Sequence, residues 1–321
     1  MTPSSSSQRQ TAILMLLLAN LFWGLSFPLI RSIELLNLRL VPSGGSFETV
    51  YAIAPRCAIA LVVLLALVAR SGYRVRRSEL KVGFVLAFAV ASGTLLQSDG
   101  LRYTAASVSA FLTQLYAILI PIWIAVRSRR NPGWVVWICT ALVLAGVAVL
   151  GRFDWATLRF GRGELETLAS SLFFMVSILW LDKKEYADNR PGHVTLVMFA
   201  AQFVVFGVLA LATAPNSQAL VAPWASPPWV GLTVILATVC TIAPFTIMIR
   251  WQPKIPAIEA GLLYCTEPIF ASLLALFLPA LFSQWAGIAY ANESATANLV
   301  LGGVLITVAN ALIQLRQPAK S

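Results

Sequence analysis

The stretch GLLYCTEPIFASLLALF, residues 261–277, is apolar except for one carboxylate, Glu267, which Pro268 follows. A charged side chain at the centre of a lipid bilayer is costly, and such residues usually face a cavity or a partner. The segment therefore indicates a membrane span that carries a functional or structural acid. The surroundings of Glu267 decide which of the two it is.

The composition of the whole chain is that of a membrane protein. Of its 321 residues, 59% are hydrophobic and only 11% are charged, which lies far outside the range of soluble globular domains. A helical span needs about 20 mostly apolar residues, and we predict ten spans: 11–33, 47–70, 81–100, 104–126, 133–151, 164–181, 192–214, 229–250, 257–279 and 296–315. The connections are short, so we expect no soluble catalytic domain.

The basic residues predict the orientation of the chain. The formal net charge is +10, but the Lys and Arg residues lie mostly in loops between spans, which favours a role in orientation over nucleic-acid binding. One side of the membrane receives 16 of the 23 basic residues and the other side six, with Arg56 inside a span. Because the cytoplasmic side carries the excess, both termini are predicted to be cytoplasmic, residues 1–10 as a disordered tail and 316–321 as a second tail.

The two halves of the chain are similar at an offset of 151 residues. ANLFWGLS (19–26) matches SSLFFMVS (170–177), and YTAASVSAFLTQLYAI (103–118) matches KIPAIEAGLLYCTEPI (254–269). Each copy, 11–151 and 164–315, has five spans, and this odd number requires the second copy to be inverted. Inverted repeats are typical of transporters with a midplane substrate site, although channels and membrane enzymes also contain repeats.

Several short motifs occur in a characteristic order along residues 11–315. They are WG-x-x-F-P at Trp23–Pro28, Arg56 in the second span, GLRYTAASVSAFLTQLY at 100–116 and TEPIFASLLA from Thr266. In these features the chain resembles the drug/metabolite transporter superfamily, EamA type, although the Gly-Glu pair that many members carry before spans five and ten is absent. The resemblance implies an all-α integral membrane protein of the bacterial plasma (inner) membrane. It also implies ten transmembrane helices, arranged as two inverted five-helix repeats around a central cavity, and export or exchange of a small metabolite.

Six side chains near the predicted bilayer centre are our candidates for substrate binding: Trp23, Arg56, Gln114, Tyr116, Tyr264 and Glu267. The offset places Thr113 and Tyr116 on Tyr264 and Glu267, and each pair, spaced i, i+3, shares one helix face. Two equivalent polar faces fit a shared central cavity.

Each charged candidate has two interpretations. Glu267 either binds a substrate amino group or carries a proton, or it is a structural residue that satisfies the helix geometry at Pro268. Arg56 either anchors a substrate carboxylate through its planar fork, or it pairs with Glu267 or with helix-end carbonyls. The aromatic candidates either line the cavity or pack in the core.

The function that these features favour is secondary transport, with export of a small amphipathic metabolite such as an amino acid by alternating access. An alternative is a sugar-phosphate or nucleotide-sugar type carrier, which needs a cluster of Lys and Arg where we find only Arg56. From a different class, a membrane enzyme or a non-transporting membrane subunit stays open. His193 is the only histidine, and no GxxxxGK[ST] motif is present, so we predict no catalytic residue, metal, cofactor or ATP coupling. The expected partners are the substrate, the lipid bilayer and, as a candidate coupling ion, the proton, in a monomer or homodimer.

Overall fold

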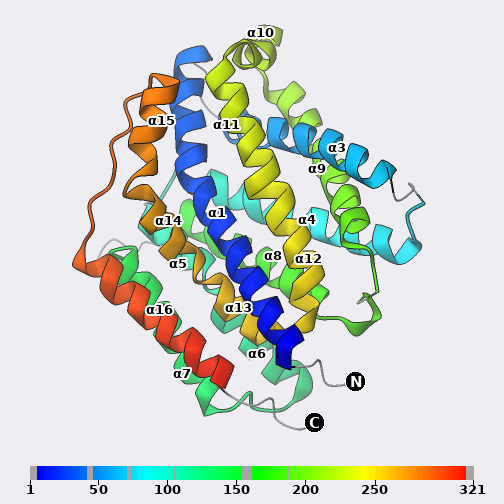
Figure 1. The fold of residues 1–321 in the computed structure, drawn as a ribbon, viewed down its shortest axis with the longest axis vertical. Helices are drawn as coiled ribbons and strands as arrows, with labels where there is room; N and C mark the ends of the chain where they lie inside the picture. The colour runs from blue at the N-terminus through cyan, green and yellow to red at the C-terminus, as the bar shows by residue number, and fades with distance from the viewer. Residues whose placement is uncertain are drawn as a thin grey trace.

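The computed structural model describes residues 6–41, 46–70, 74–104, 106–153, 161–186 and 188–315. These residues form helices and turns, without a strand in the described ranges. Most helices run between the two ends of the molecule, and the start of α1 and the end of α16 lie at the same end (Figure 1). This placement is what an even number of membrane crossings requires.

The ten predicted spans are all present as apolar helical segments, which confirms the predicted all-α membrane fold. Within the described residues, nine are long and apolar enough to cross a membrane, and the tenth, α7, is a shorter apolar helix. In chain order they are α1 (Ser6–Leu40), α2 with α3 (Ser46–Tyr51, Ala54–Ala69), α4 (Arg77–Gly100), α5 with α6 (Ala106–Thr113, Tyr116–Ser128), α7 (Trp134–Leu150), α8 (Arg162–Leu181), α9 (Pro191–Thr213), α11 with η4 and α12 (Pro227–Ala237, Thr238–Ile242, Ala243–Trp251), α13 with α14 (Ala257–Tyr264, Glu267–Ala275), and α16 (Ala297–Leu315).

Shorter helices lie in the connections between the spans. They are η2 (Lys184–Tyr186), α10 (Ser217–Val221), η3 (Ala222–Ala225), η5 (Gln252–Lys254) and α15 (Leu278–Ala286). The last of them lies in the connection between α14 and α16, the final span.

The start of the chain departs from the predicted tail. Residues 6–10, which we expected to be disordered, form the first turns of α1. They are held there because the Arg9 guanidinium forms an ion pair with Glu259 at 2.9 Å and also donates to the Gln314 carbonyl at 3.5 Å. Residues 1–5 and the second predicted tail, 316–321, lie outside the described residues.

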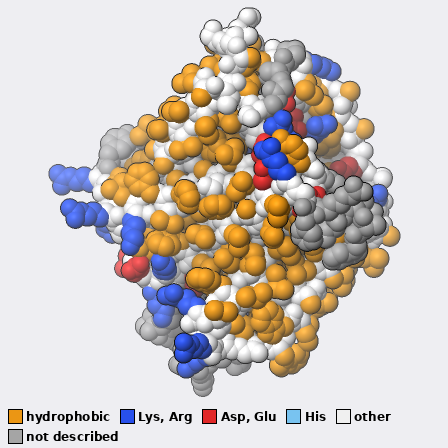
Figure 2. Space-filling view, turned by 180° about the vertical axis from the view of Figure 1, so that it is seen from behind, with side chains coloured by type: hydrophobic (Ala, Val, Ile, Leu, Met, Phe, Trp, Pro, Cys, Tyr) orange, Lys and Arg blue, Asp and Glu red, His pale blue; other side chains and the backbone are white. Residues whose placement is uncertain are grey.

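The outer surface is largely hydrophobic, as a lipid-facing surface must be. Figure 2 shows a broad apolar surface, with Lys and Arg side chains gathered along the left edge and toward the lower end. Large apolar side chains such as Val126, Trp134 and Leu315 are more than two-thirds exposed, while Asn20, Gln114 and Thr167 are buried. In water this arrangement would be unfavourable, so the molecule is built for a bilayer.

The two repeats interlock through helices that approach each other at glycine. A Cβ atom added at Gly302 of α16 would lie 2.6 Å from the Gly146 carbonyl oxygen of α7. Likewise, a Cβ at Gly163 of α8 would lie 2.8 Å from the Gly100 carbonyl oxygen of α4. Each contact joins a helix of the first repeat to one of the second, so the repeats form one packed bundle.

Candidate functional site

Spans four and nine are interrupted at equivalent positions. The first break separates α5, which ends at Thr113, from α6, which begins at Tyr116; the second separates α13, which ends at Tyr264, from α14, which begins at Glu267. These positions match at the offset of 151 found in the sequence. Broken helices leave backbone groups free inside a membrane and occur where they are buried in protein or line a cavity.

The backbone hydrogen bonds of the two breaks also match. The Leu115 N–H donates to Leu112 O at 3.2 Å, and at the same offset the Thr266 N–H donates to Leu263 O at 3.0 Å. On the far side of each break, the Ile118 and Ile269 N–H groups each bond a carbonyl three residues earlier at 3.0 Å. The internal repeat is therefore present in backbone geometry as well as in residue identity.

The residue types explain the second break better than the first. Glu267 and Pro268 occupy the first turn of α14, where a carboxylate favours the positive end of the helix dipole and proline loses no hydrogen bond. In the first repeat Ala117 stands where the second has Pro268. We have no physical account of the first break from its own residues.

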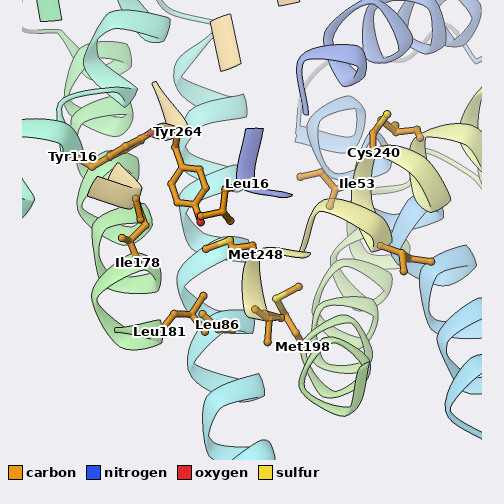
Figure 3. Close-up of a cluster of buried hydrophobic side chains, with 14 of the residues drawn as sticks. Leu16, Ile53, Leu86, Tyr116, Ile178, Leu181, Met198, Cys240, Met248 and Tyr264 are labelled. Carbon is orange, nitrogen blue, oxygen red and sulfur yellow. The ribbon is translucent and has the colours of Figure 1, made fainter. Parts of the chain in front are cut away.

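Three aromatic candidates come together beside the breaks. Tyr264 packs edge-on against Trp23, with ring centroids 5.6 Å apart, and Figure 3 shows Tyr116 next to Tyr264 in the same buried cluster. The Tyr264 hydroxyl donates to Gln252 Oε1 at 2.9 Å, and Gln252 Nε2 donates to the Ile178 carbonyl at 2.7 Å. Tyr264 is thus fixed in the core, and its hydroxyl is already occupied.

Glu267 begins α14 close to this cluster. Its carboxylate acts electrostatically on the Tyr116 hydroxyl, as do Cys265 and Tyr264. The first residue of α6 therefore faces the break of the other repeat, and the two breaks adjoin each other. Gln114, inside the first break, is buried, and its Oε1 atom has no hydrogen-bond partner among the described residues.

Arg56 lies in a different group. Cys57 of its own helix and Cys240 of the π-helical turn η4 act electrostatically on it. Gln202 joins them, since its Oε1 atom accepts from Cys57 Sγ at 3.9 Å. The structure thus brings Trp23, Tyr116, Tyr264 and Glu267 together, while Arg56 has other neighbours.

Both intramembrane charges are partly exposed. Within the described part of the chain, neither Arg56 nor Glu267 forms an ion pair or a side-chain hydrogen bond, so the two do not pair with each other. Burying an unpaired charge in apolar surroundings is costly. Each charged group therefore adjoins accessible space.

Two amides that sequence reasoning missed stabilise the second break. Asn20 Nδ2 of α1 donates to Leu263 O at 2.8 Å and to Thr266 Oγ1 at 2.9 Å. Asn310 Nδ2 of α16 donates to Leu262 O at 3.2 Å. The signal available in the sequence was an amide within each apolar span, which does not reveal the face on which it lies.

The described residues contain no group of three or more His, Cys, Asp or Glu that could hold a metal ion. All four cysteines are buried and unbridged. The arrangement offers one acid, one guanidinium and an aromatic wall, which suit binding of a small polar or amphipathic molecule.

Comparison with known proteins finds a family model that matches the first repeat. Residues 10–152 match the EamA-like transporter family. The uncharacterized transporter YwfM of Bacillus subtilis (strain 168) is 28% identical over 172 residues, which cover 52% of this chain and 54% of YwfM. The match thus spans about half the length of that relative. It confirms, together with the family match, the resemblance that the sequence motifs indicate.

The fold extends over the whole chain. One solved crystal structure superposes with a TM-score of 0.70 at 17% sequence identity, covering 95% of this chain and 97% of the other. At this identity the likeness concerns the fold alone, and it confirms the ten-helix arrangement.

Proposed function

We propose that this chain, a multi-pass membrane protein of the EamA type, is a secondary transporter that exports a small amphipathic metabolite, such as an amino acid, by alternating access. The observation that carries the proposal is the pair of equivalent helix breaks in spans four and nine, which adjoin each other and leave Glu267 unpaired. Discontinuous helices at the interface of inverted repeats are a common construction for transporter substrate sites.

In this proposal the two unpaired charges divide the recognition of the substrate. Glu267 holds the amino group or exchanges it for a proton, and Arg56 attracts the carboxylate. Trp23 and Tyr116 provide the apolar wall beside Glu267. Neither charge has a protein partner among the described residues to displace, so binding would cost no internal ion pair.

Ion pairs between the repeats at both ends of the bundle fit an alternating mechanism. At the end that holds the termini, Arg190 pairs with Glu79 at 2.8 Å. At the other end, Arg162 pairs with Asp99 at 2.5 Å. Because each pair joins a helix of one repeat to one of the other, we infer that opening either end requires the separation of one of them.

We further propose that the protein lies in the bacterial plasma membrane with both termini in the cytoplasm. The excess of Lys and Arg in the loops on the side of the termini supports this orientation. Export is the direction that the family resemblance favours. Coupling to protons would follow if Glu267 changes its protonation during the cycle.

The test is efflux of a panel of labelled amino acids from cells that express the chain, compared with Glu267→Gln. The variant keeps the shape of the side chain and removes its charge. Glu293→Gln is the matched control, because Glu293 is exposed in the connection before α16. We expect the wild type and the control to accelerate the loss of some amino acids and Glu267→Gln to reduce that rate at least tenfold. Equal export by all three would assign Glu267 a structural role, and no export of any amino acid would contradict the proposed substrate.

A further inference from the structure

A cavity of about 400 Å³ lies at the end of the bundle where the termini are. Its wall comes from the start of α1, the residues that precede α9, and the end of α12 with η5. The polar residues that line it are Gln8, Asn189, Arg190, Arg250, Trp251 and Lys254. This volume lies in the range of small-molecule sites, and the lining contains three cations and no carboxylate.

The three cations are not equivalent. Arg190 is held by Glu79, whose buried carboxylate accepts from Arg190 Nε and from its NH2 group at 2.8 Å. This hydrogen bonding raises the pKa of the Arg190 guanidinium, and its charge is compensated. Arg190 therefore lines the cavity but contributes little to the attraction of an anionic ligand.

Arg250 and Lys254 form no ion pair with any described residue. The Arg250 guanidinium lies 5.4 Å from the centre of the Trp251 ring. This contact leaves the N–H groups in the guanidinium plane available to a ligand. Lys254 follows one turn later in η5. The cavity thus carries about two positive charges that no acid in its wall balances.

The start of α9 reinforces this charge. It follows Asn189, whose Oδ1 atom accepts from Ser78 Oγ at 2.7 Å. The first residue of α9, Pro191, also lines the cavity, so the positive end of this helix points toward it. Two cations without an ion-pair partner among the described residues and a helix start favour an oxyanion with several acceptor oxygens.

We propose that this cavity binds a phosphate group, carried either by the headgroup of an anionic phospholipid or by a soluble phosphate compound. Trp251 and the two cations stand at the end of an apolar span, where aromatic and basic residues meet lipid headgroups. Bound phosphate would join α1 of the first repeat to α9 and α12 of the second. It would therefore stabilise the conformation in which these three helices meet.

The experiment measures the thermal unfolding of the full chain, purified in a neutral detergent. One arm adds phosphatidylglycerol or, as its neutral counterpart, phosphatidylcholine; the other adds inorganic phosphate or chloride at equal ionic strength. The test variant is Arg250→Gln with Lys254→Gln. The control is Arg127→Gln with Arg130→Gln, which removes the same charge from exposed positions around the α6–α7 connection at the same end (Figure 1).

We expect a phosphate-bearing ligand to raise the unfolding temperature of the wild type and the control by several degrees, and to bind the test variant at least tenfold more weakly. Stabilisation by phosphatidylglycerol alone identifies a lipid headgroup, and stabilisation by inorganic phosphate identifies a soluble ligand. Stabilisation by neither, or equal loss in both double variants, would overturn the proposal. Asn189→Asp is a second test variant. Its carboxylate keeps the shape of the side chain that lines the cavity and should weaken phosphate binding by repulsion.

Discussion

The break between α5 and α6 and the break between α13 and α14 have matching backbone hydrogen bonds, yet different side chains surround them. At the second break, Asn20 and Asn310 donate to the carbonyls of Leu263 and Leu262. At the first, the residue that corresponds to Asn20 is Ser171, which is fully buried and whose hydroxyl has no partner among the described residues. Neighbouring helices thus donate to main-chain carbonyls at the second break, whereas at the first Gln97 Nε2 of α4 donates to a side chain, Thr113 Oγ1, at 3.0 Å. Both breaks contain buried polar atoms without a partner among the described residues, Gln114 Oε1 at the first and Asn20 Oδ1 and Asn310 Oδ1 at the second.

The helix beside the second break also packs more closely than the helix beside the first. Gly24 of α1 lets α14 approach so closely that an added Cβ would lie 2.7 Å from Phe270 Cβ and 2.8 Å from the Ala271 nitrogen. The position that corresponds to Gly24 in α8 is Met175, a long side chain in place of a glycine. Accordingly, α14 packs more extensively on α1 than α6 packs on α8.

The comparison teaches that the repeat preserves the backbone geometry of the break but not its support. Movement of the second break would break the amide bonds that α1 and α16 make to its carbonyls, and a carbonyl left without a partner costs free energy, so we infer that the first break has less to lose on moving. If alternating access rearranges these helices, we expect the α5–α6 break to deform first and the α13–α14 break to move with α1 as one unit.

The largest effect should come from Gly24→Ala. The new methyl group meets backbone and Cβ atoms of α14 at less than 3.0 Å, so α1 and α14 must separate, and we expect a loss of about 3 kcal/mol in the free energy of unfolding. The measurement is unfolding of the purified chain in mixed micelles.

Gly207→Ala is the matched control for Gly24→Ala. It lies within α9, and no atom stands within 4 Å of the added Cβ, so its helix propensity alone should make it neutral or stabilising by up to about 1 kcal/mol. Equal losses in the two variants would contradict the tight α1–α14 contact.

A smaller loss should follow from Asn20→Leu. The substitution keeps the volume of the side chain but removes both hydrogen bonds to the second break. Polar contacts inside membrane proteins are modest because alternative partners exist, and Leu263 O keeps its bond from Thr266, so we expect a loss of about 2 kcal/mol. A loss below about 0.5 kcal/mol, measured in the same way, would show that Asn20 does not support the break.

Sequence reasoning predicted the spans more completely than the breaks, for a physical reason. Ten spans follow from apolar length, and the offset of the repeat follows from residue matches, since both are properties of the chain alone. An interrupted helix leaves the same apolar window as a continuous one, and the first break contains neither Gly nor Pro between Thr113 and Ala117. The sequence therefore predicted continuous spans at both positions.

The sequence predicted those features of the candidate site that lie within one helix, and not the contacts between helices. The i, i+3 pairing of Tyr264 with Glu267 follows from helix geometry, and the structure adds that Glu267 starts a helix. That Tyr264 is fixed by Gln252, and that Arg56 lies beside Cys240 rather than Glu267, depend on contacts between distant spans. No single-helix pattern contains those contacts.

The smallest expected effect is also the one that decides the comparison. Ser171→Ala removes one oxygen from a fully buried position where the hydroxyl has no partner among the described residues. Because the folded state then no longer holds a desolvated, unpaired hydroxyl, we expect the free energy of unfolding to stay equal or to rise by up to about 1 kcal/mol. The matched measurement is Ser170→Ala in the same helix, whose hydroxyl donates to Thr167 O at 2.7 Å and whose loss should lower stability. If Ser171→Ala instead lowers stability as much as Asn20→Leu, then Ser171 supports the first break as Asn20 supports the second. Neighbouring helices would then stabilise the two breaks equally, and the deformation of the bundle would have to begin elsewhere.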